Sequence, residues 1–298
     1  MTQKQPDILC IGSVLWDVIG RAASHMRVGS DVPGRITRLP GGVAMNIAMT
    51  LSRFGLKPGL LTAIGRDAEG DELIGEATRM GLICDHVYRS DDLPTDIYMA
   101  IEGANGLIAA IADAHSLEAA GAKILRPLED GTLGSVTAPY TGYVALDGNL
   151  TEDLLREIAK SPLFSAADLR VAPASPGKAA RLLALLGHPS ATLYVNLEEA
   201  GLICQTTFAD SATAVHALCT RGAHRVLVTN GGDMAAEGTA GSVIEAAPPA
   251  VMVTRVTGAG DTFMAAHIAS EREGLDRDAA LARALQAAAT YVSGETPL

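Results

Sequence analysis

Short apolar segments that end in glycine or a polar residue recur along this chain. The first covers residues 8–11 and stops at Gly12-Ser13, which is typical of a buried strand. Further strands of this kind are expected at residues 59–64, 142–146, 192–196 and 225–229. Segments with helical spacing separate most of them, so the strands are expected to run parallel.

Helical periodicity fills much of the sequence between these strands. In residues 43–54 the apolar positions Val43, Ile47 and Leu51 share one face, and Gly55 marks the end. Other helices are expected at residues 71–80, 151–160, 176–186 and 211–221, and two more begin at Asp261 and Asp276. This alternation predicts an α/β fold in which helices cover both faces of a parallel sheet.

One region breaks the alternation with two adjacent strands. Residues 96–102 and 107–113 are joined by Gly103-Ala104-Asn105-Gly106, a sequence typical of a hairpin turn. Residues 34–39 predict a further short strand, and residues 18–22 are a candidate for another. We expect a small sheet inserted at about 18–39 and 96–113 into one domain of residues 1–298. Both faces of the hairpin are fairly apolar, which favours a lid over a ligand, a contact with a second subunit, or both.

The composition restricts the classes of function. Hydrophobic residues make up 48% of the 298 residues and charged residues 19%, so the chain can bury a large core. The net charge of −11 argues against a protein that binds nucleic acid through its phosphates. It does not exclude a phosphorylated ligand, because a local site can be positive on an acidic surface.

Two further features of the sequence concern its cellular setting. No segment approaches the ~18–20 apolar residues of a membrane span, and residues 1–7 lack an apolar signal core. A cytoplasmic protein with no membrane partner is therefore expected. The cysteines lack the spacing of a metal site and are expected to be reduced thiols; they are Cys10, Cys84, Cys204 and Cys219.

The run Val256-Thr257-Gly258-Ala259-Gly260-Asp261-Thr262-Phe263 carries the clearest candidate chemistry. A glycine loop that opens a helix presents free N–H groups and the positive end of the helix dipole, which together attract phosphate oxygens. Asp261 adds a carboxylate base to this anion site, as phosphoryl transfer to a hydroxyl requires. A plain strand-to-helix turn capped by Asp261 is the alternative. The chain has no GxxxxGK[ST] motif, and its first strand is not followed by GxGxxG.

A second glycine motif, Gly41-Gly42, precedes the expected helix at 43–54. Glycines here permit a close approach of the backbone to a ligand, and Asn46 follows one turn inside the helix. Asp17 lies just past the first strand, at the edge where α/β sheets bind ligands, and could accept hydrogen bonds from sugar hydroxyls. An ordinary loop at the start of a helix and a solvated aspartate are the alternatives.

Two later strands also end in polar residues. Asn196 and Glu199 follow one strand and could orient a hydrated Mg²⁺, although a helix capping pattern explains them equally well. Thr229 and the glycines Gly231 and Gly232 follow the next strand and suit nucleotide phosphates, although a plain turn is the alternative.

Taken together, these motifs resemble the ribokinase-like carbohydrate kinases of the PfkB family. The resemblance runs from about Asp7 to the C-terminus, and its two signatures are Gly41-Gly42 and the segment Thr257-Gly258-Ala259-Gly260-Asp261. It implies a three-layer α/β/α fold with a mainly parallel central sheet and a small β-sheet lid. It also implies an enzyme that transfers the γ-phosphate of ATP to an alcohol of a sugar or nucleoside.

The resemblance also assigns roles to residues. Asp261 would accept the proton of the acceptor hydroxyl, and the N–H groups of Gly258, Ala259 and Gly260 would bind the phosphoryl oxygens. The acceptor sugar would be bound by Asp17, Gly41, Gly42 and Asn46. Mg²⁺ and the ATP site would involve Asn196, Glu199, Thr229, Gly231, Gly232 and Ala288. K⁺ is a further candidate cofactor, and a homodimer formed through the lid is expected.

Within the family, residues 31–48, 111–113 and 147–150 are most similar to bacterial pseudouridine kinases. This likeness implies phosphorylation of the 5′-hydroxyl of pseudouridine. Candidate contacts to this substrate are Asp31, Tyr98, Asp113 and Asn149, of which the last three could equally be polar residues that stabilise the fold. The alternatives are a ribokinase, a fructokinase, an adenosine or inosine kinase, or an inactive homologue that only binds a ligand.

Three positions depart from the family pattern. Leu15 stands where many relatives have Asn, and Val171-Ala172-Pro173 stands where Val-Asp-Pro is frequent. Met234-Ala235 stands where the family prefers a further glycine. These differences affect the expected substrate more than the reaction class.

The position of Asp261 at a helix N-terminus predicts a lowered pKa. A weak base is compatible with phosphoryl transfer, because the transition state is loose and the hydroxyl loses its proton late. We therefore expect Asp261 mainly to orient the acceptor hydroxyl.

Overall fold

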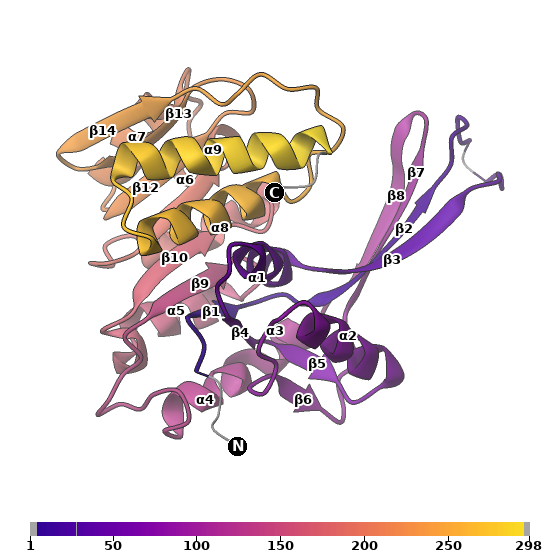
Figure 1. Cartoon of the computed structure of the whole chain (residues 1–298), viewed down its shortest axis with the longest axis horizontal. Coiled ribbons are helices and arrows are strands. Elements are labelled where there is room, and N and C mark those ends of the chain that lie inside the picture. The colour runs from indigo at the N-terminus through magenta and orange to yellow at the C-terminus, as the bar shows by residue number, and fades with distance from the viewer. Residues whose placement is uncertain (1–4, 28, 295–298) are drawn as a thin grey trace.

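The computed structural model describes residues 5–27 and 29–294 and shows a large sheet and a smaller one set apart from it (Figure 1). The large sheet has the strand order β14-β13-β12-β11-β10-β9-β1-β4. Strands from β4 to β12 in this order run parallel, whereas β13 and β14 are antiparallel additions. The strands are β1 (Ile8–Ile11), β4 (Pro58–Leu61), β9 (Tyr143–Asp147), β10 (Asp168–Ala172), β11 (Thr192–Asn196), β12 (Arg225–Thr229), β13 (Ala235–Thr239) and β14 (Ser242–Ala246).

Helices cover both faces of the large sheet (Figure 1). One face is covered by α1 (Val43–Arg53), α2 (Ala68–Arg79), α8 (Ala259–Arg272) and α9 (Arg277–Ser293). The other face is covered by α3 (Ser116–Ala120), η1 (Gly121–Leu125), α4 (Arg126–Glu129), α5 (Glu152–Lys160), η2 (Pro162–Phe164), η3 (Pro176–Leu185), α6 (Leu197–Cys204) and α7 (Ser211–Thr220). The result is a three-layer α/β/α arrangement, as the sequence predicts.

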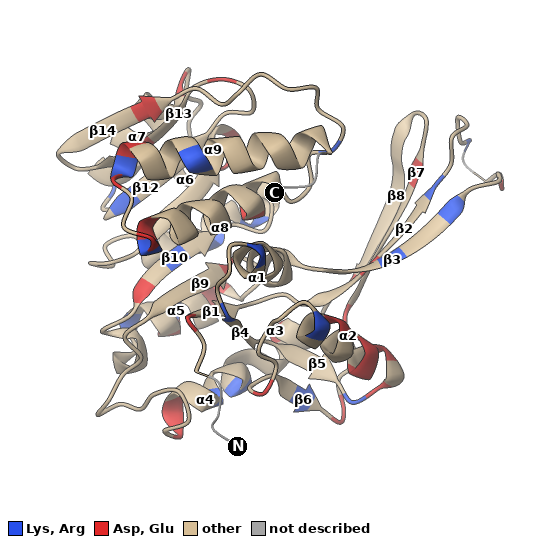
Figure 2. Ribbon diagram, viewed as in Figure 1, with Lys and Arg blue, Asp and Glu red and all other residues tan. Residues whose placement is uncertain are grey.

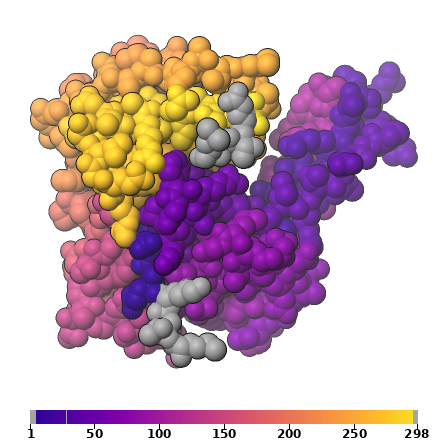
Figure 3. Space-filling model, viewed as in Figure 1, coloured from indigo at the N-terminus to yellow at the C-terminus, as the bar shows by residue number. Residues whose placement is uncertain are grey.

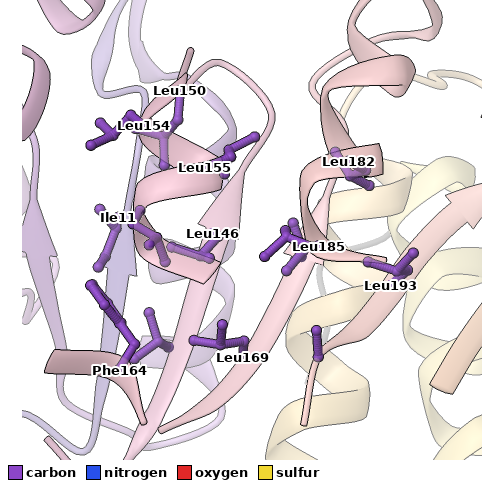
Figure 4. Packing of buried hydrophobic residues seen from close by; sticks show 14 of the residues in the cluster. Ile11, Leu146, Leu150, Leu154, Leu155, Phe164, Leu169, Leu182, Leu185 and Leu193 are labelled. Carbon is purple, nitrogen blue, oxygen red and sulfur yellow. The ribbon is translucent and has the colours of Figure 1, made fainter. Parts of the chain in front are cut away.

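The two cores follow from the alternation of side chains along each strand. In β1, Leu9 and Ile11 belong to one core, whereas Ile8 and Cys10 belong to the other. Figure 4 shows part of the first of these cores, where leucines of α5 lie beside Ile11 and Leu146 and leucines of η3 lie toward Leu193. Because helices bury both faces of the sheet, the carboxyl ends of its strands are rigidly positioned and can carry the residues of a site.

The smaller sheet, here called the lid, has the order β3-β2-β7-β8. Its strands are β2 (Leu15–Arg21), β3 (Arg35–Gly41), β7 (Ile97–Gly103) and β8 (Gly106–Asp113). The pairs β2–β3 and β7–β8 are antiparallel, and β2 and β7 run parallel. The lid stands off the body and leaves a notch beside it (Figure 3). A separate parallel pair consists of β5 (Ala63–Gly65) and β6 (Tyr88–Ser90).

The sequence-based prediction of an α/β fold with a small extra sheet is confirmed, and several elements differ in detail. The segment expected as one strand at 59–64 is divided between β4 and β5, and the segment at 176–186 is 3₁₀ rather than α-helical. The β13–β14 hairpin was not predicted, because Ala235–Thr239 contains a single β-branched residue and no aromatic residue. Within the described chain, no helix is long and apolar enough to span a membrane.

Candidate active site

Part of the candidate site lies where parallel strands of the large sheet end. Asn196 is the last residue of β11 and pairs in register with Thr229, the last residue of β12. Asp147 is the last residue of β9 and pairs with Ala172 of β10. This edge is where open α/β sheets bind ligands, because the loops after the strands leave a crevice there.

The two glycine signatures meet through a side-chain hydrogen bond. Asn46, on α1, donates from Nδ2 to Oδ2 of Asp261, on the first turn of α8, at 2.9 Å. Gly258 caps α8 with a φ of 87°, a left-handed conformation that favours glycine. The predicted base and a predicted acceptor-binding residue are therefore in direct contact, although 215 positions separate them.

The pKa of Asp261 is raised to about 7, chiefly by burial. The carboxylates of Asp147, Glu199 and Asp17 raise it further, whereas the hydrogen bond from Asn46 lowers it. The expectation of a lowered pKa is therefore wrong: loss of hydration and three like charges outweigh the helix N-terminus. A carboxylate with a pKa near neutrality is well suited to accept a proton.

Asp17 and Gly41 form the acceptor side of the site. A Cβ atom at Gly41 would lie 2.0 Å from Oδ2 of Asp17, so only glycine leaves room for this carboxylate. Gly42 has a φ of 93°, and a Cβ atom there would lie 2.5 Å from the carbonyl oxygen of Ser13. Burial raises the pKa of Asp17 to about 6. The glycine motif thus allows β3 and the start of α1 to pack tightly against Asp17 and Ser13.

Asp147 joins three loops of the site and was not among the predicted site residues. Its carboxylate is fully buried and accepts hydrogen bonds from the N–H groups of Ser13 at 2.7 Å, Ala44 at 3.2 Å, and Asn149. Burial nevertheless raises its pKa. The available signal was an acidic residue at the end of an otherwise apolar strand, where an unpartnered carboxylate would be costly.

Substitution of Asp147 by Asn is expected to destabilise the protein by about 1–3 kcal/mol, because an amide offers one acceptor where the carboxylate serves three N–H groups. Urea denaturation would measure the loss. Asp153→Asn is the matched control, since that side chain is 93% exposed on α5. Equal stability of Asp147→Asn and wild type would contradict this role.

The predicted phosphate site at the start of α8 is partly occupied by internal hydrogen bonds. The N–H of Ala259 donates to the carbonyl of Val256 at 3.1 Å, so this group is engaged within the turn. Within residues 5–27 and 29–294, no backbone acceptor is found for the N–H groups of Gly260 and Asp261. These two groups, rather than Ala259, are the donors that this conformation leaves for an anion.

Asn196 and Glu199 form the capping box that the sequence offered as an alternative. Oδ1 of Asn196 accepts from the N–H of Glu199, and Oε2 of Glu199 accepts from the N–H of Asn196, each at 2.8 Å. Glu199 is only 7% exposed, and burial raises its pKa. Among the described residues, no cluster of three or more acidic, His or Cys side chains could enclose a metal ion.

This donor set nevertheless fits a hydrated Mg²⁺. Mg²⁺ typically keeps several waters and binds one or two carboxylates together with substrate phosphates. The carboxylates of Asp17, Asp147 and Glu199 all raise the pKa of Asp261, which shows uncompensated negative charge at the site. A divalent cation beside Glu199 would offset part of that charge.

The remaining nucleotide-site candidates lie in three different places. Thr229 ends β12 beside Asn196, whereas Gly231 and Gly232 are exposed in the following loop. Ala288 is half-buried on α9 and packs against the core beneath α8 and α1. Their role in binding ATP stays a prediction.

The candidate contacts to pseudouridine are only partly brought together. Tyr98 pairs with Asp17 across β2 and β7, so the two side chains share one face of the lid. Asp113 pairs with Ile97, and its side chain belongs to the opposite face. Asp31 is exposed in the loop at the outer end of the lid, beyond the pair of Arg21 with Arg35. Within a single chain, neither Asp31 nor Asp113 lies at the site, because loop position separates Asp31 from Asp17 and strand register separates Asp113 from it.

Asn149 is held by a partner that the sequence did not reveal. Its Oδ1 accepts a hydrogen bond from Nζ of Lys178, on η3, at 2.6 Å. The pair lies one loop beyond Asp147, so an ammonium group and an amide stand together next to the acceptor side. Helical spacing alone could not place Lys178 there, because the loop before η3 determines its approach.

Two hollows lie on other parts of the described surface. Hollows of about 350 Å³ and about 290 Å³ are lined by residues such as Met49 and Arg170, and neither includes a predicted site residue. The lid stands away from the body near the point where β3 leads into α1 (Figures 1 and 3). Closure of the lid would therefore be needed to exclude water from an acceptor.

Comparison with known proteins identifies the family. Residues 5–296 match the model of the pfkB family carbohydrate kinases. The chain is 30% identical to an uncharacterized sugar kinase, YeiI, of Escherichia coli K12, over 98% of this chain and 80% of that protein. It is 28% identical to a pseudouridine kinase of the same organism, over 87% of this chain and 81% of that protein.

Solved structures show the same fold. A ribokinase of Arabidopsis thaliana, complexed with ribose and ATP, superposes with a TM-score of 0.74 at 21% identity, covering 97% of this chain and 93% of that one. The chain therefore belongs to the pfkB family of carbohydrate kinases. It is an ATP-dependent phosphotransferase that acts on a hydroxyl group.

Proposed function

We propose that this enzyme phosphorylates the 5′-hydroxyl of pseudouridine and gives pseudouridine 5′-phosphate and ADP. The observation that carries the chemistry is the contact between Asn46 and Asp261, which joins a base of pKa about 7 to the acceptor side. The likeness to a pseudouridine kinase supports the choice of substrate. A ribokinase, a fructokinase, another nucleoside kinase and an inactive binding homologue are the alternatives.

In this proposal the residues of the acceptor side orient the ribose. Asp17 accepts hydrogen bonds from sugar hydroxyls, and Gly41 and Gly42 let the backbone approach the ring. Asn46 holds the carboxylate of Asp261 toward the 5′-hydroxyl, and Asp261 accepts its proton as the new P–O bond forms. Asp147 keeps Ser13 and the start of α1 in place beneath the sugar.

The phosphate side provides electrostatic stabilisation. The N–H groups at Gly258–Asp261 would bind phosphoryl oxygens, with Gly260 and Asp261 as the principal donors. ATP supplies the transferred group, and Mg²⁺ would offset its negative charge, held through water by Asn196 and Glu199. Thr229, Gly231, Gly232 and Ala288 would line the nucleotide site.

The base of the acceptor would lie between the lid and the loop after β9. Tyr98 shares the face of Asp17, and Asn149 with Lys178 offers hydrogen-bond donors to the carbonyl oxygens of a uracil ring. Residues 1–298 would act as one kinase domain. The four cysteines are free thiols, which supports a reducing cytoplasmic setting.

Release of ADP with a panel of acceptors tests this proposal. We expect pseudouridine to give the highest kcat/KM among pseudouridine, uridine, adenosine, ribose and fructose. Activity with free sugars and none with pseudouridine would reject the substrate. If pseudouridine raises the melting temperature and no acceptor releases ADP, the binding homologue would replace the enzyme.

We also propose that two chains pair through the lid. Ile36, Met99 and Ile111 are 77%, 44% and 68% exposed, and the strand register places them on one face together with Ile101. Figure 2 shows few charged residues along β7 and β8. An apolar face of this kind on an otherwise acidic protein is typical of a contact between subunits.

Ile111→Asp is expected to convert a dimer into a monomer, because it places a charge within this apolar face. Light scattering of the purified variant would give the mass. Val136→Asp is the control, since Val136 is 62% exposed outside the lid. A monomeric wild type, or a dimeric Ile111→Asp, would contradict pairing through the lid.

A further inference from the structure

The segment that precedes the phosphate site is fastened to the end of α9. Thr254 donates from its N–H to the carbonyl of Val292 at 2.8 Å, and Nε of Arg255 donates to the carbonyl of Tyr291 at 2.7 Å. The guanidinium of Arg255 lies over the ring of Tyr291, 3.8 Å from its centroid. An exposed arginine held by both a stacked ring and a hydrogen bond has little freedom left.

The same tyrosine also contacts the cap of α8. Its hydroxyl donates to the carbonyl of Thr257 at 2.9 Å, and a Cβ atom at Gly258 would lie 2.6 Å from that hydroxyl oxygen. One aromatic ring therefore touches both Arg255 and the turn from which the N–H groups of α8 emerge. Tyr291 therefore links the positive charge of Arg255 to the turn at the predicted phosphate site.

The site carries negative charge that a cation such as Arg255 would offset. Asp17, Asp147 and Glu199 all add negative charge around Asp261, and a nucleotide would add more. Among the described residues, Arg255 forms no ion pair with a carboxylate, and of its guanidinium nitrogens only Nε donates a hydrogen bond. Its outer nitrogens are therefore available to an anion, and a guanidinium matches the geometry of a phosphate.

We propose that Arg255, held in place by Tyr291, binds the terminal phosphates of the nucleotide. This inference rests on the proposed function, because it places those phosphates at the start of α8. It adds a side-chain cation to a site that otherwise consists of backbone N–H groups. Loss of the charge would therefore weaken the binding of ATP most, the binding of ADP less and the binding of AMP least, because only the phosphates beyond the first contact Arg255.

Binding of AMP, ADP and ATP to Arg255→Gln, measured by calorimetry without an acceptor, tests the proposal. We expect affinity for ATP to fall about tenfold, affinity for ADP to fall less, and affinity for AMP to stay within twofold. Arg255→Lys keeps the charge and is expected to regain part of the loss. Equal losses for all three nucleotides, or no loss for ATP, would overturn the proposal.

Two controls separate this inference from other failures. Arg283→Gln removes an arginine of α9 that stacks on Phe54 at 5.2 Å and pairs with Glu273, the C-cap residue of α8, and this variant should bind all three nucleotides as wild type does. A melting temperature of Arg255→Gln equal to that of wild type shows that the fold is intact. If wild type binds ATP but no acceptor is phosphorylated, the proposed substrate fails while the role of Arg255 is still decided by the binding series.

Discussion

Asp261→Asn is expected to lower the kcat for acceptor phosphorylation by at least ~10²-fold, because an amide cannot accept the proton of the hydroxyl. ATP should still bind, since the substitution keeps the size of the side chain and the start of α8. The structure strengthens this expectation. The pKa of Asp261 is raised to about 7, so its carboxylate is a better base than an ordinary aspartate.

The dependence of wild-type kcat/KM on pH provides an independent test of the role of Asp261. Asp261 is protonated below about pH 7 and ionised above it, so activity should rise as pH increases through 7. Asp17, with a pKa raised to about 6, should add a second loss of activity at lower pH. Steady-state rates between pH 5 and 9, with constant saturating metal, would define the profile.

Asp276→Asn is the matched control for the substitution of Asp261. Asp276 caps the start of α9 through its own side chain, is exposed, and lies at the end of α8 opposite to Asp261. It should leave both kcat and the pH profile unchanged. Turnover of Asp261→Asn close to that of wild type would remove Asp261 from the chemistry.

Gly41→Ala is expected to reduce kcat/KM for the acceptor about 100-fold. The added methyl group would displace the carboxylate of Asp17, which must be accurately positioned to bind the sugar. The new Cβ would lie 2.0 Å from Oδ2 of Asp17. That atom is the end of a side chain and can move, so the fold should survive while Asp17 is misplaced. The loss should appear with the acceptor and leave KM for ATP unchanged.

Gly75→Ala provides the control for Gly41→Ala. Gly75 lies within α2, and a Cβ atom there meets no atom within 4 Å. Alanine should be tolerated or slightly stabilising there, because it favours the helix. If Gly41→Ala retains normal acceptor kinetics, close packing against Asp17 is not what the glycine provides.

Much of the fold could be predicted because its strands and helices carry strong local signals. The strands β1, β11 and β12 appear at the residues where apolar runs end in Ser13, Asn196 and Thr229. The helices α5 and α7 are preceded by the N-cap residues Thr151 and Asp210, whose side chains accept hydrogen bonds from N–H groups of the first turn. A segment with weaker strand propensity, β13, depends on its neighbours and was missed, and its hairpin partner β14 was missed with it.

The sequence offers candidate residues for the site but not the contacts that join them. The hydrogen bond between Asn46 and Asp261, and the three bonds to Asp147, join segments that only the folded sheet brings together. The raised pKa of Asp261 depends on these same neighbours, so the helix N-terminus alone gave the wrong direction. Strand register also cannot be predicted from a local sequence. A shift of one residue along a strand reverses the face of each side chain, and the observed register places Tyr98, but not Asp113, on the face of Asp17.

The central claim is that this site joins a phosphate from ATP to the 5′-hydroxyl of pseudouridine. Mass spectrometry and phosphorus NMR of the products, after incubation with ATP, Mg²⁺ and pseudouridine, test it most directly. The account predicts pseudouridine 5′-phosphate and ADP in equal amounts, and formation of both at least ~10²-fold slower with Asp261→Asn. ADP with free phosphate and unmodified pseudouridine, or a phosphate ester on another hydroxyl, would contradict it.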